Sequence, residues 1–249
     1  MENENKKRNI EIFDSYWSSG IELYESHPTS RHRRRFVRKC LPGKGSETNP
    51  FVFDYGCGTG AVLREVKQLL DLDNSRLGGC DISSRSIELV GKLLPGGSFH
   101  LGSYPEISGK IDIAICSEVI EHTAEYRQVL EWIAANLNQG GLLILSTPRV
   151  PMDPPDKIYG HVQHFRLQEL RGLLQELGFE IQAAREWGFP FFTLQKWVTR
   201  LFFDRISKSV LEQPMNWKKH LVFSMAYRLY FIHDLIPFGP QIFISARKK

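Results

Sequence analysis

Five side chains combine acidic and basic chemistry at spacings that could bring them together. Three lie in the run Ser117-Glu118-Val119-Ile120-Glu121-His122, directly after an apolar stretch, and two lie in Gly160-His161-Val162-Gln163-His164. If a helix begins after the apolar stretch, Glu118, Glu121 and His122 occupy positions i, i+3 and i+4 and project from one face. Neutral imidazoles accept protons, and carboxylates together with imidazoles bind divalent cations.

These residues therefore have two predicted uses. The candidate general bases are His122, His161 and His164. The candidate ligands of a divalent cation (Mg, Mn or Zn) are Glu118, Glu121, His122 and His164, and such a cation would help a hydroxyl group to ionise near neutral pH. In the alternative without a metal, Glu118 lies beside a cofactor and His122 is a hydrogen-bonded residue or a base.

A glycine-rich turn precedes this run. The segment from Phe51 to Gly60 reads Phe-Val-Phe-Asp-Tyr-Gly-Cys-Gly-Thr-Gly, and a helical pattern follows over Ala61–Leu72. Glycine permits positive φ and lets a ligand lie against backbone N–H groups, so the turn should bind a nucleotide-like molecule. The pattern also satisfies the dinucleotide motif G-x-G-x-x-A. Asp54 instead favours S-adenosylmethionine, because a carboxylate repels a pyrophosphate and attracts an ammonium or a sulfonium.

Asp81 ends the next predicted strand, Arg76–Cys80. An acid at this position can accept two hydrogen bonds from a ribose diol. The alternative is that Asp81 caps a helix that begins near Ser83 and Ser84.

Strands and helices alternate through the middle of the chain. Further buried strands are predicted over Lys110–Cys116, Leu142–Pro148, Phe179–Ala184 and Gln241–Ala246, with helices over Thr123–Asn138, ending at Gly140-Gly141, and over Leu167–Leu177. Such βαβ alternation predicts an α/β fold with a mainly parallel sheet and helices on both faces.

The two ends of the chain differ from this core. We predict an N-terminal helical cap over residues 1–45 with a break at Gly20, an α/β core over 46–186, an apolar helical insertion over 187–240, and a final core strand with a basic tail over 241–249. The cluster Arg31-His32-Arg33-Arg34-Arg35 suits a solvated helix face or a contact with an anionic group.

The motif D-x-G-x-G-x-G, matched from Asp54 to Gly60, resembles the first motif of class I S-adenosylmethionine-dependent methyltransferases. This resemblance implies a Rossmann-like, seven-stranded fold. In the segment Phe99–Ser103, Ser103 stands where many members carry aspartate near the adenine. The expected cofactor contacts are Asp54, Gly56, Cys57, Gly58, Thr59, Gly60, Asp81, Ile82, Ser103 and Ser117.

The run E-x-x-E-H resembles that of ubiquinone-biosynthesis O-methyltransferases and of small-RNA 3′-terminal 2′-O-methyltransferases, in which these side chains are implicated with a divalent cation. The first group fits more of the chain, up to about Phe179, and the sequence shows no appended RNA-binding module, so no nucleic-acid partner is expected. The resemblance implies O-methylation of a small or lipid-linked acceptor. The alternatives are an N- or C-methyltransferase and a non-catalytic protein that binds S-adenosylmethionine.

Composition is that of a soluble globular protein, with 249 residues, 42% hydrophobic and 24% charged residues and a net charge of +4. The polar N-terminus is not followed by the apolar run of a signal peptide, and Cys40, Cys57, Cys80 and Cys116 have no C-x-x-C spacing. We expect reduced thiols and a cytoplasmic location. The apolar runs of the insertion predict a peripheral contact with the cytoplasmic membrane face, a lid over an apolar substrate, or a homodimer contact.

Overall fold

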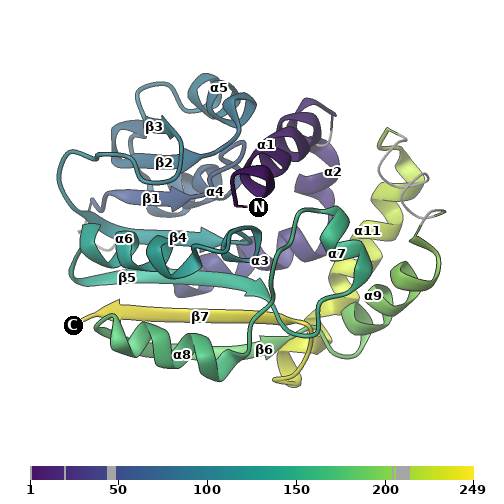
Figure 1. Cartoon of the computed structure of the whole chain (residues 1–249). Coiled ribbons are helices and arrows are strands. Elements are labelled where there is room, and N and C mark those ends of the chain that lie inside the picture. Colours follow the sequence, from purple (N-terminus) through teal and green to yellow (C-terminus); the bar gives the residue numbers. More distant parts are fainter. Residues whose placement is uncertain (1, 20, 44–48, 204, 206–213) are drawn as a thin grey trace.

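The computed structural model describes residues 2–19, 21–43, 49–203, 205 and 214–249, arranged around one seven-stranded sheet (Figure 1). The strand order is β3-β2-β1-β4-β5-β7-β6. The strands are β1 Val52–Tyr55, β2 Leu77–Asp81, β3 Ser98–Leu101, β4 Ile111–Ser117, β5 Leu137–Pro148, β6 Phe179–Trp187 and β7 Gln241–Lys248. Neighbours from β3 through to β5 are parallel, and β7 is antiparallel to both β5 and β6. The predicted α/β fold with a mainly parallel sheet is confirmed.

The sheet is covered on both faces because alternate residues of its central strands point to opposite sides. Phe53 and Ala114 face one apolar core, which helices α6 (Tyr126–Asn136) and α8 (Leu167–Glu176) complete in front of the sheet in Figure 1. Val52 and Ile113 face a second core. That core is completed by α3 (Pro28–Cys40), α4 (Ala61–Leu70) and α5 (Ser84–Leu93).

The predicted glycine stop after α6 is wrong. The helix ends at Asn136, Leu137 already has an extended backbone, and β5 begins there. Pairing with β4 then shifts register, since Ile111 pairs with Leu137 and Ile113 with Leu142. Gly140, with a φ of 73°, lies within this irregular stretch, so the glycine pair accommodates a bulge rather than a helix end. At the other edge, β6 continues past the predicted Ala184 to Trp187, because it stays paired with β7.

The N-terminal region consists of α1 (Glu2–Ser19), α2 (Ile21–Ser26) and α3. Gly20, the predicted break, lies outside the described residues, as does the predicted boundary at residues 45 and 46. Short helices lie between larger elements: η1 Asn74–Arg76, η2 Ile120–His122 and α7 Pro154–Ile158.

Between β6 and β7 the chain leaves the sheet to form α9 (Phe191–Leu201), α11 (Trp217–Leu229) and η3 (Tyr230–Leu235). Trp187 and Gln241 pair directly at the base of this insertion. Gly188 and Gly239 follow and precede that pair with φ of 119° and 147°. A Cβ at Gly239 would lie 2.4 Å from the carbonyl oxygen of Trp187, so the two chain segments approach as closely as glycine allows.

The basic cluster of α3 forms a junction with this insertion, so the solvated-face prediction is wrong. His32 is buried, and its Nε2 donates to the carbonyl of Tyr227 at 2.8 Å. The Arg31 guanidinium lies 3.7 Å from the centre of the Tyr227 ring. Arg35 donates two hydrogen bonds of 2.7 Å to Asp234. These contacts fix α11 against the N-terminal helices.

The junction predicts a pH dependence of stability. Burial lowers the pKa of His32 from 6.5 to about 4, assisted by Arg35, although the Tyr227 carbonyl acts in the opposite direction. Below pH 6.5 His32 therefore binds a proton in the unfolded chain but stays neutral in the folded protein. The free energy of unfolding falls as pH drops towards 4. The contribution of His32 is up to about 1.4 kcal/mol per pH unit in this window.

Denaturant unfolding of the intact chain and of His32→Gln across this window tests the prediction. The glutamine keeps a donor and an acceptor but does not titrate, so the difference between the two unfolding free energies should shrink as pH falls. A constant difference would contradict the assignment.

Candidate active site

The glycine turn follows β1 as predicted and is held against β2. Gly56, Gly58 and Gly60 have φ of 79°, 50° and 75°. The backbone N–H groups of Gly56 and Cys57 donate to the carbonyl of Cys80 at 2.8 and 3.0 Å. A Cβ at Gly56 would lie 2.3 Å from Val119 Cγ2, so neither the backbone conformation nor the space admits a side chain there.

Two carboxylates flank this turn. Asp54 is 2% exposed, and burial, followed by the charge of Asp81, raises its pKa well above the ordinary value. Asp81 accepts hydrogen bonds of 2.9 Å from the N–H groups of Gly58 and Ser83. Ser83 is itself the N-cap of α5, so helix capping is not the role of Asp81. Two acids confined together in a low-polarity site attract a cation, which fits a cofactor carrying an ammonium and a sulfonium.

A cavity of about 640 Å³ connects this turn with the acid and histidine residues. Of the predicted cofactor contacts, it is lined by Asp54, Gly56, Cys57, Gly58, Thr59, Asp81, Ile82, Ser103 and Ser117. Gly60 is instead the N-cap residue of α4 and faces Val90. The same cavity is lined by Glu118, Glu121, His122 and His161. The predicted cofactor contacts and the candidate bases His122 and His161 therefore line the same cavity.

Glu118, Glu121 and His122 do not project from one helical face as predicted. Glu118 has a φ of 60°, in the left-handed region, and only the single turn of η2 follows. The Glu118 carboxylate accepts hydrogen bonds from Arg33 (3.3 Å), Ser146 (2.9 Å) and Gln241 (2.6 Å). The residue serves as an anchor for three elements rather than as a partner of His122.

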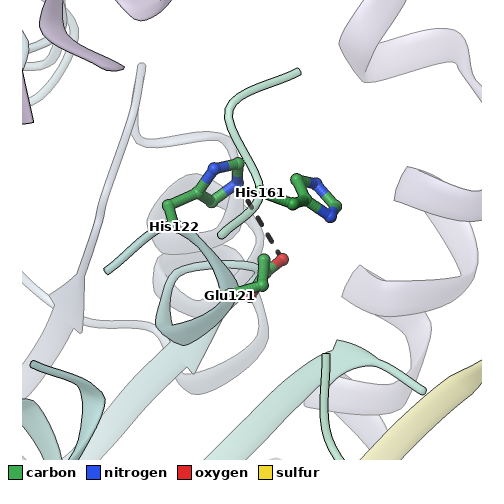
Figure 2. Close-up of side chains that lie close together, drawn as sticks. All are labelled: Glu121, His122 and His161. Atoms are coloured by element: carbon green, nitrogen blue, oxygen red, sulfur yellow. Dashed lines mark ion pairs between the residues drawn. The ribbon is translucent and has the colours of Figure 1, made fainter. Parts of the chain in front are cut away.

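Glu121 is fully buried beside His122. Its Oε2 accepts a hydrogen bond of 3.0 Å from Thr147 Oγ1, its Oε1 has no hydrogen-bond partner, and its Oε1 lies 4.0 Å from His122 Nε2. Burial and the neighbouring Glu118 raise the pKa of Glu121, whereas burial lowers that of His122 to about 4. Figure 2 shows the rings of His122 and His161 next to each other, with the Glu121 carboxylate pointing toward both.

The loop that carries His161 and His164 is tied to this segment through the backbone. The carbonyl of Glu121 accepts a hydrogen bond of 2.8 Å from the N–H of Val162. The rings of His122 and His161 then meet edge to face, with centroids 4.6 Å apart. His164 lies behind His161, with a fully buried side chain, so it does not reach the cavity directly.

Hydrogen bonding sets the tautomer of His161. His164 Nδ1 faces the carbonyl of Arg149 at 3.2 Å, and because a carbonyl only accepts, this nitrogen carries the proton. Burial lowers the pKa of both rings, which keeps them neutral. His164 Nε2 must then accept from His161 Nδ1, 2.8 Å away. His161 is left with an unprotonated Nε2 available to accept a proton or bind a cation.

Two groups of three side chains bring potential ligand atoms within 4.8 Å of one another in the described part of the chain. One consists of Glu121, His122 and His161, and the other of Asp156, His161 and His164. Neither contains Glu118, so the predicted set of Glu118, Glu121, His122 and His164 is not assembled as one group among these residues.

A family model described as a methyltransferase domain matches residues 30–184, which is more than half of the chain. The chain belongs to the methyltransferase domain family. It is a class I S-adenosylmethionine-dependent methyltransferase. Its sequence matches no curated protein.

Solved structures share the fold at low sequence identity. A chain of the Haloferax volcanii complex between the Trm112 methyltransferase activator and a methyltransferase has a TM-score of 0.61 and 17% identity, with 94% of this chain and 96% of that chain covered. Phosphoethanolamine N-methyltransferase 2 of Haemonchus contortus, with S-adenosylhomocysteine bound, has a TM-score of 0.60 and 14% identity. The match covers 88% of this chain and 52% of that protein, about half its length. Magnesium protoporphyrin IX methyltransferase of Synechocystis has a TM-score of 0.52 and 17% identity, with 88% and 84% covered.

Several residues that line the methyltransferase cavity were not singled out from the sequence. Tyr16 and Tyr24 come from the N-terminal helices, Arg33 from α3 and Lys196 from α9. Lys196 lies 3.2 Å from Asp156, which joins α9 to α7. Arg33 belonged to a visible basic cluster, but the sequence carried no signal for which of its members points inward.

Asp81→Asn should weaken S-adenosylmethionine binding. The substitution removes a charged acceptor from a predicted ribose contact, and a hydrogen bond to a charged group contributes about 1.5–3 kcal/mol, or roughly 10- to 100-fold in affinity. Calorimetric titration of both proteins with S-adenosylmethionine and with NADH measures this. Asp73→Asn, at an exposed acid before η1, is the matched control. Equal affinity of all three proteins would exclude Asp81 as a cofactor contact.

Proposed function

We propose that this methyltransferase methylates a hydroxyl oxygen of a small or lipid-linked acceptor, in the manner of the ubiquinone-biosynthesis enzymes that its E-x-x-E-H run resembles. The observation that carries the proposal is the position of His161 in the cavity that the glycine turn also lines, with its Nδ1 bonded to His164 so that Nε2 is assigned the lone pair. An oxygen nucleophile must lose a proton during methyl transfer, so a base at this point suits an O-methyltransferase.

His161 would take the hydroxyl proton on Nε2 as the acceptor oxygen forms its bond to the methyl carbon. The bond from that carbon to sulfur breaks, and S-adenosylhomocysteine leaves. Proton uptake is unfavourable for a buried imidazole alone, because burial lowers the pKa of His161. The Glu121 carboxyl, within 4.8 Å of His161, would stabilise the imidazolium, and His164 would hold the ring in the required orientation.

The acceptor side of the cavity is largely aromatic. Phe192 of α9, Phe203 beyond its end and Phe223 of α11 line it opposite Tyr16 and Tyr24. Aromatic side chains accommodate an apolar body, and the tyrosine hydroxyls together with Arg33 and Lys196 offer polar and charged contacts. This lining supports an acceptor with an aromatic or lipid-linked body.

The second candidate role of the His161 Nε2 lone pair is to bind a divalent cation. Glu121, His122 and His161 would hold it, and the partnerless Glu121 Oε1 in a fully buried position supports this arrangement. Such a cation would lower the pKa of an acceptor hydroxyl. Mixed carboxylate and imidazole ligation suits Mg, Mn or Zn. His161 cannot be base and ligand at once, so the two candidates exclude each other.

N- or C-methylation on the same core, and cofactor binding without catalysis, are the competing functions. An amine acceptor that is already neutral has less need of a base, so loss of His161 would affect it little. A regulator that only binds S-adenosylmethionine would transfer no methyl group at all.

His161→Gln should lower methyl transfer by roughly 10²- to 10⁴-fold while leaving S-adenosylmethionine binding unchanged. The assay supplies methyl-labelled S-adenosylmethionine with lipid and aqueous fractions of a cell extract and follows label in each fraction. His220→Gln, at an exposed histidine of α11, is the control. Undiminished transfer by His161→Gln would exclude its role as a base.

Chelation distinguishes the base from the cation. If His161 acts as a base without metal, dialysis against EDTA leaves transfer intact. If the cation candidate is right, EDTA abolishes transfer, added Mg, Mn or Zn restores it, and Glu121→Ala is inactive even with added cation. Full activity of the chelated protein together with full activity of Glu121→Ala would rule the cation out.

A further inference from the structure

The insertion presents a row of apolar side chains to solvent. On α11, Trp217, Leu221, Met225 and Leu229 recur every four residues and are 71%, 53%, 62% and 42% exposed. Residues four apart lie on one side of a helix, so these four form a single stripe. The row continues into η3 with Leu235, which is 81% exposed.

Helix α9 adds a second stripe. Leu194, Trp197 and Leu201 are 54%, 57% and 54% exposed at spacings of three and four. Both helices contact η3 and lie at the right of Figure 1, on the side of the molecule opposite β3 and α5. We call these two stripes together the outer face of the insertion. Large apolar side chains exposed in stripes of this kind are typical of an interaction site.

The charges on the two helices are of one sign. Their sequences, Phe191–Leu201 and Trp217–Leu229, contain no aspartate or glutamate but include Lys196, Arg200, Lys218, Lys219 and Arg228. Lys196 and Arg200 lie within 4 Å of acids of the α7 segment, whereas Lys218 and Arg228 are exposed. Exposed apolar stripes bordered by positive charge, with an indole at one end, complement the anionic headgroups and acyl boundary of a membrane surface.

The inner sides of the same helices line the cavity through Phe192 and Phe223. Each helix therefore stands between the candidate active site and the outer face. In the described parts of the chain, no helix is both long enough and apolar enough to cross a bilayer, which leaves peripheral attachment as the form of contact with lipid.

We propose that the outer face docks this protein on an anionic membrane surface, with α9 and α11 lying against the headgroups. Docking in this position would place two helices that line the cavity against the lipid. The further consequence, that a membrane-partitioned acceptor enters the cavity between the two helices, rests on the proposed function. The docking itself does not.

The charge pattern disfavours a second copy of the chain as the occupant. A two-fold interface places the same surface on both partners, so Lys218 and Arg228 of each copy would face a surface whose helices carry no acid. Like charges brought together across an interface oppose association. An anionic lipid surface neutralises these same residues.

The experiment is flotation of the full-length protein with phosphatidylglycerol-containing vesicles and with pure phosphatidylcholine vesicles, at low and high salt. Leu221→Glu is compared with Leu93→Glu, an exposed leucine of α5 on the far side of the molecule with 46% exposure against 53%. Both variants carry the same change of size and charge. The S-adenosylmethionine affinity and sedimentation coefficient of each protein are measured alongside.

We expect the intact protein and Leu93→Glu to float with the anionic vesicles, weakly with neutral ones and less at high salt. Leu221→Glu should lower the partition coefficient about tenfold or more, with unchanged S-adenosylmethionine affinity. Docking is overturned if the intact protein does not float, or if both variants float equally. It is also overturned if the protein is a stable dimer that Leu221→Glu dissociates. Flotation without any methyl transfer would overturn the proposed function alone.

Discussion

The carboxylate of Glu118 is the contact on which the arrangement of this site depends. It gathers donors from α3, β5 and β7, namely Arg33, Ser146 and Gln241, and so joins the N-terminal helices to the last strand of the sheet. The Glu118 side chain is 19% exposed. Removal of a partner such as Arg33 would leave its charge poorly compensated. Both Glu118 oxygens accept hydrogen bonds from these donors, whereas Glu121, three residues later, keeps one oxygen without a hydrogen-bond partner. Two similar acids thereby acquire different environments and different uses.

The parts of the structure that follow from local patterns were predictable, and the parts that depend on distant contacts were not. Apolar runs and the glycine turn identified the strands and the cofactor side, since strand burial and positive φ leave direct signatures in residue type. Nothing local indicates that Glu118 adopts a left-handed backbone, and its partner Arg33 lies 85 positions earlier. The glycine pair at Gly140 suits a helix end and a bulge equally well, and only pairing with β4 decides between them. The tautomer of His161 likewise depends on a carbonyl of Arg149 in another strand segment.

The residues that line the cavity come both from the range matched by the family model and from outside it. Residues 30–184 include the glycine turn, both acids and the histidines. The aromatic lining opposite comes mostly from outside that range, with Tyr16 and Tyr24 before it and Phe192 and Phe223 after it. The later of these segments is held against α3, at the start of the matched range, through His32 and Tyr227 and through Arg35 and Asp234. The predicted cofactor contacts therefore lie within the matched range, and most of the aromatic lining lies outside it.

The insertion is closed at its base, where Trp187 pairs with Gln241 and where Gly188 and Gly239 approach each other. The pairing of β6 with β7 therefore depends little on the length of the insertion. The ladder of β6 and β7 already holds the two ends together, so the chain between them closes a loop whose entropic cost grows only by about 0.6 kcal/mol for each doubling of length. Residues added to or removed from the segment between Gly188 and Gly239 would therefore leave the pairing of β6 with β7 in place. The paired base thus lets the insertion vary in length while β6 and β7 keep their register.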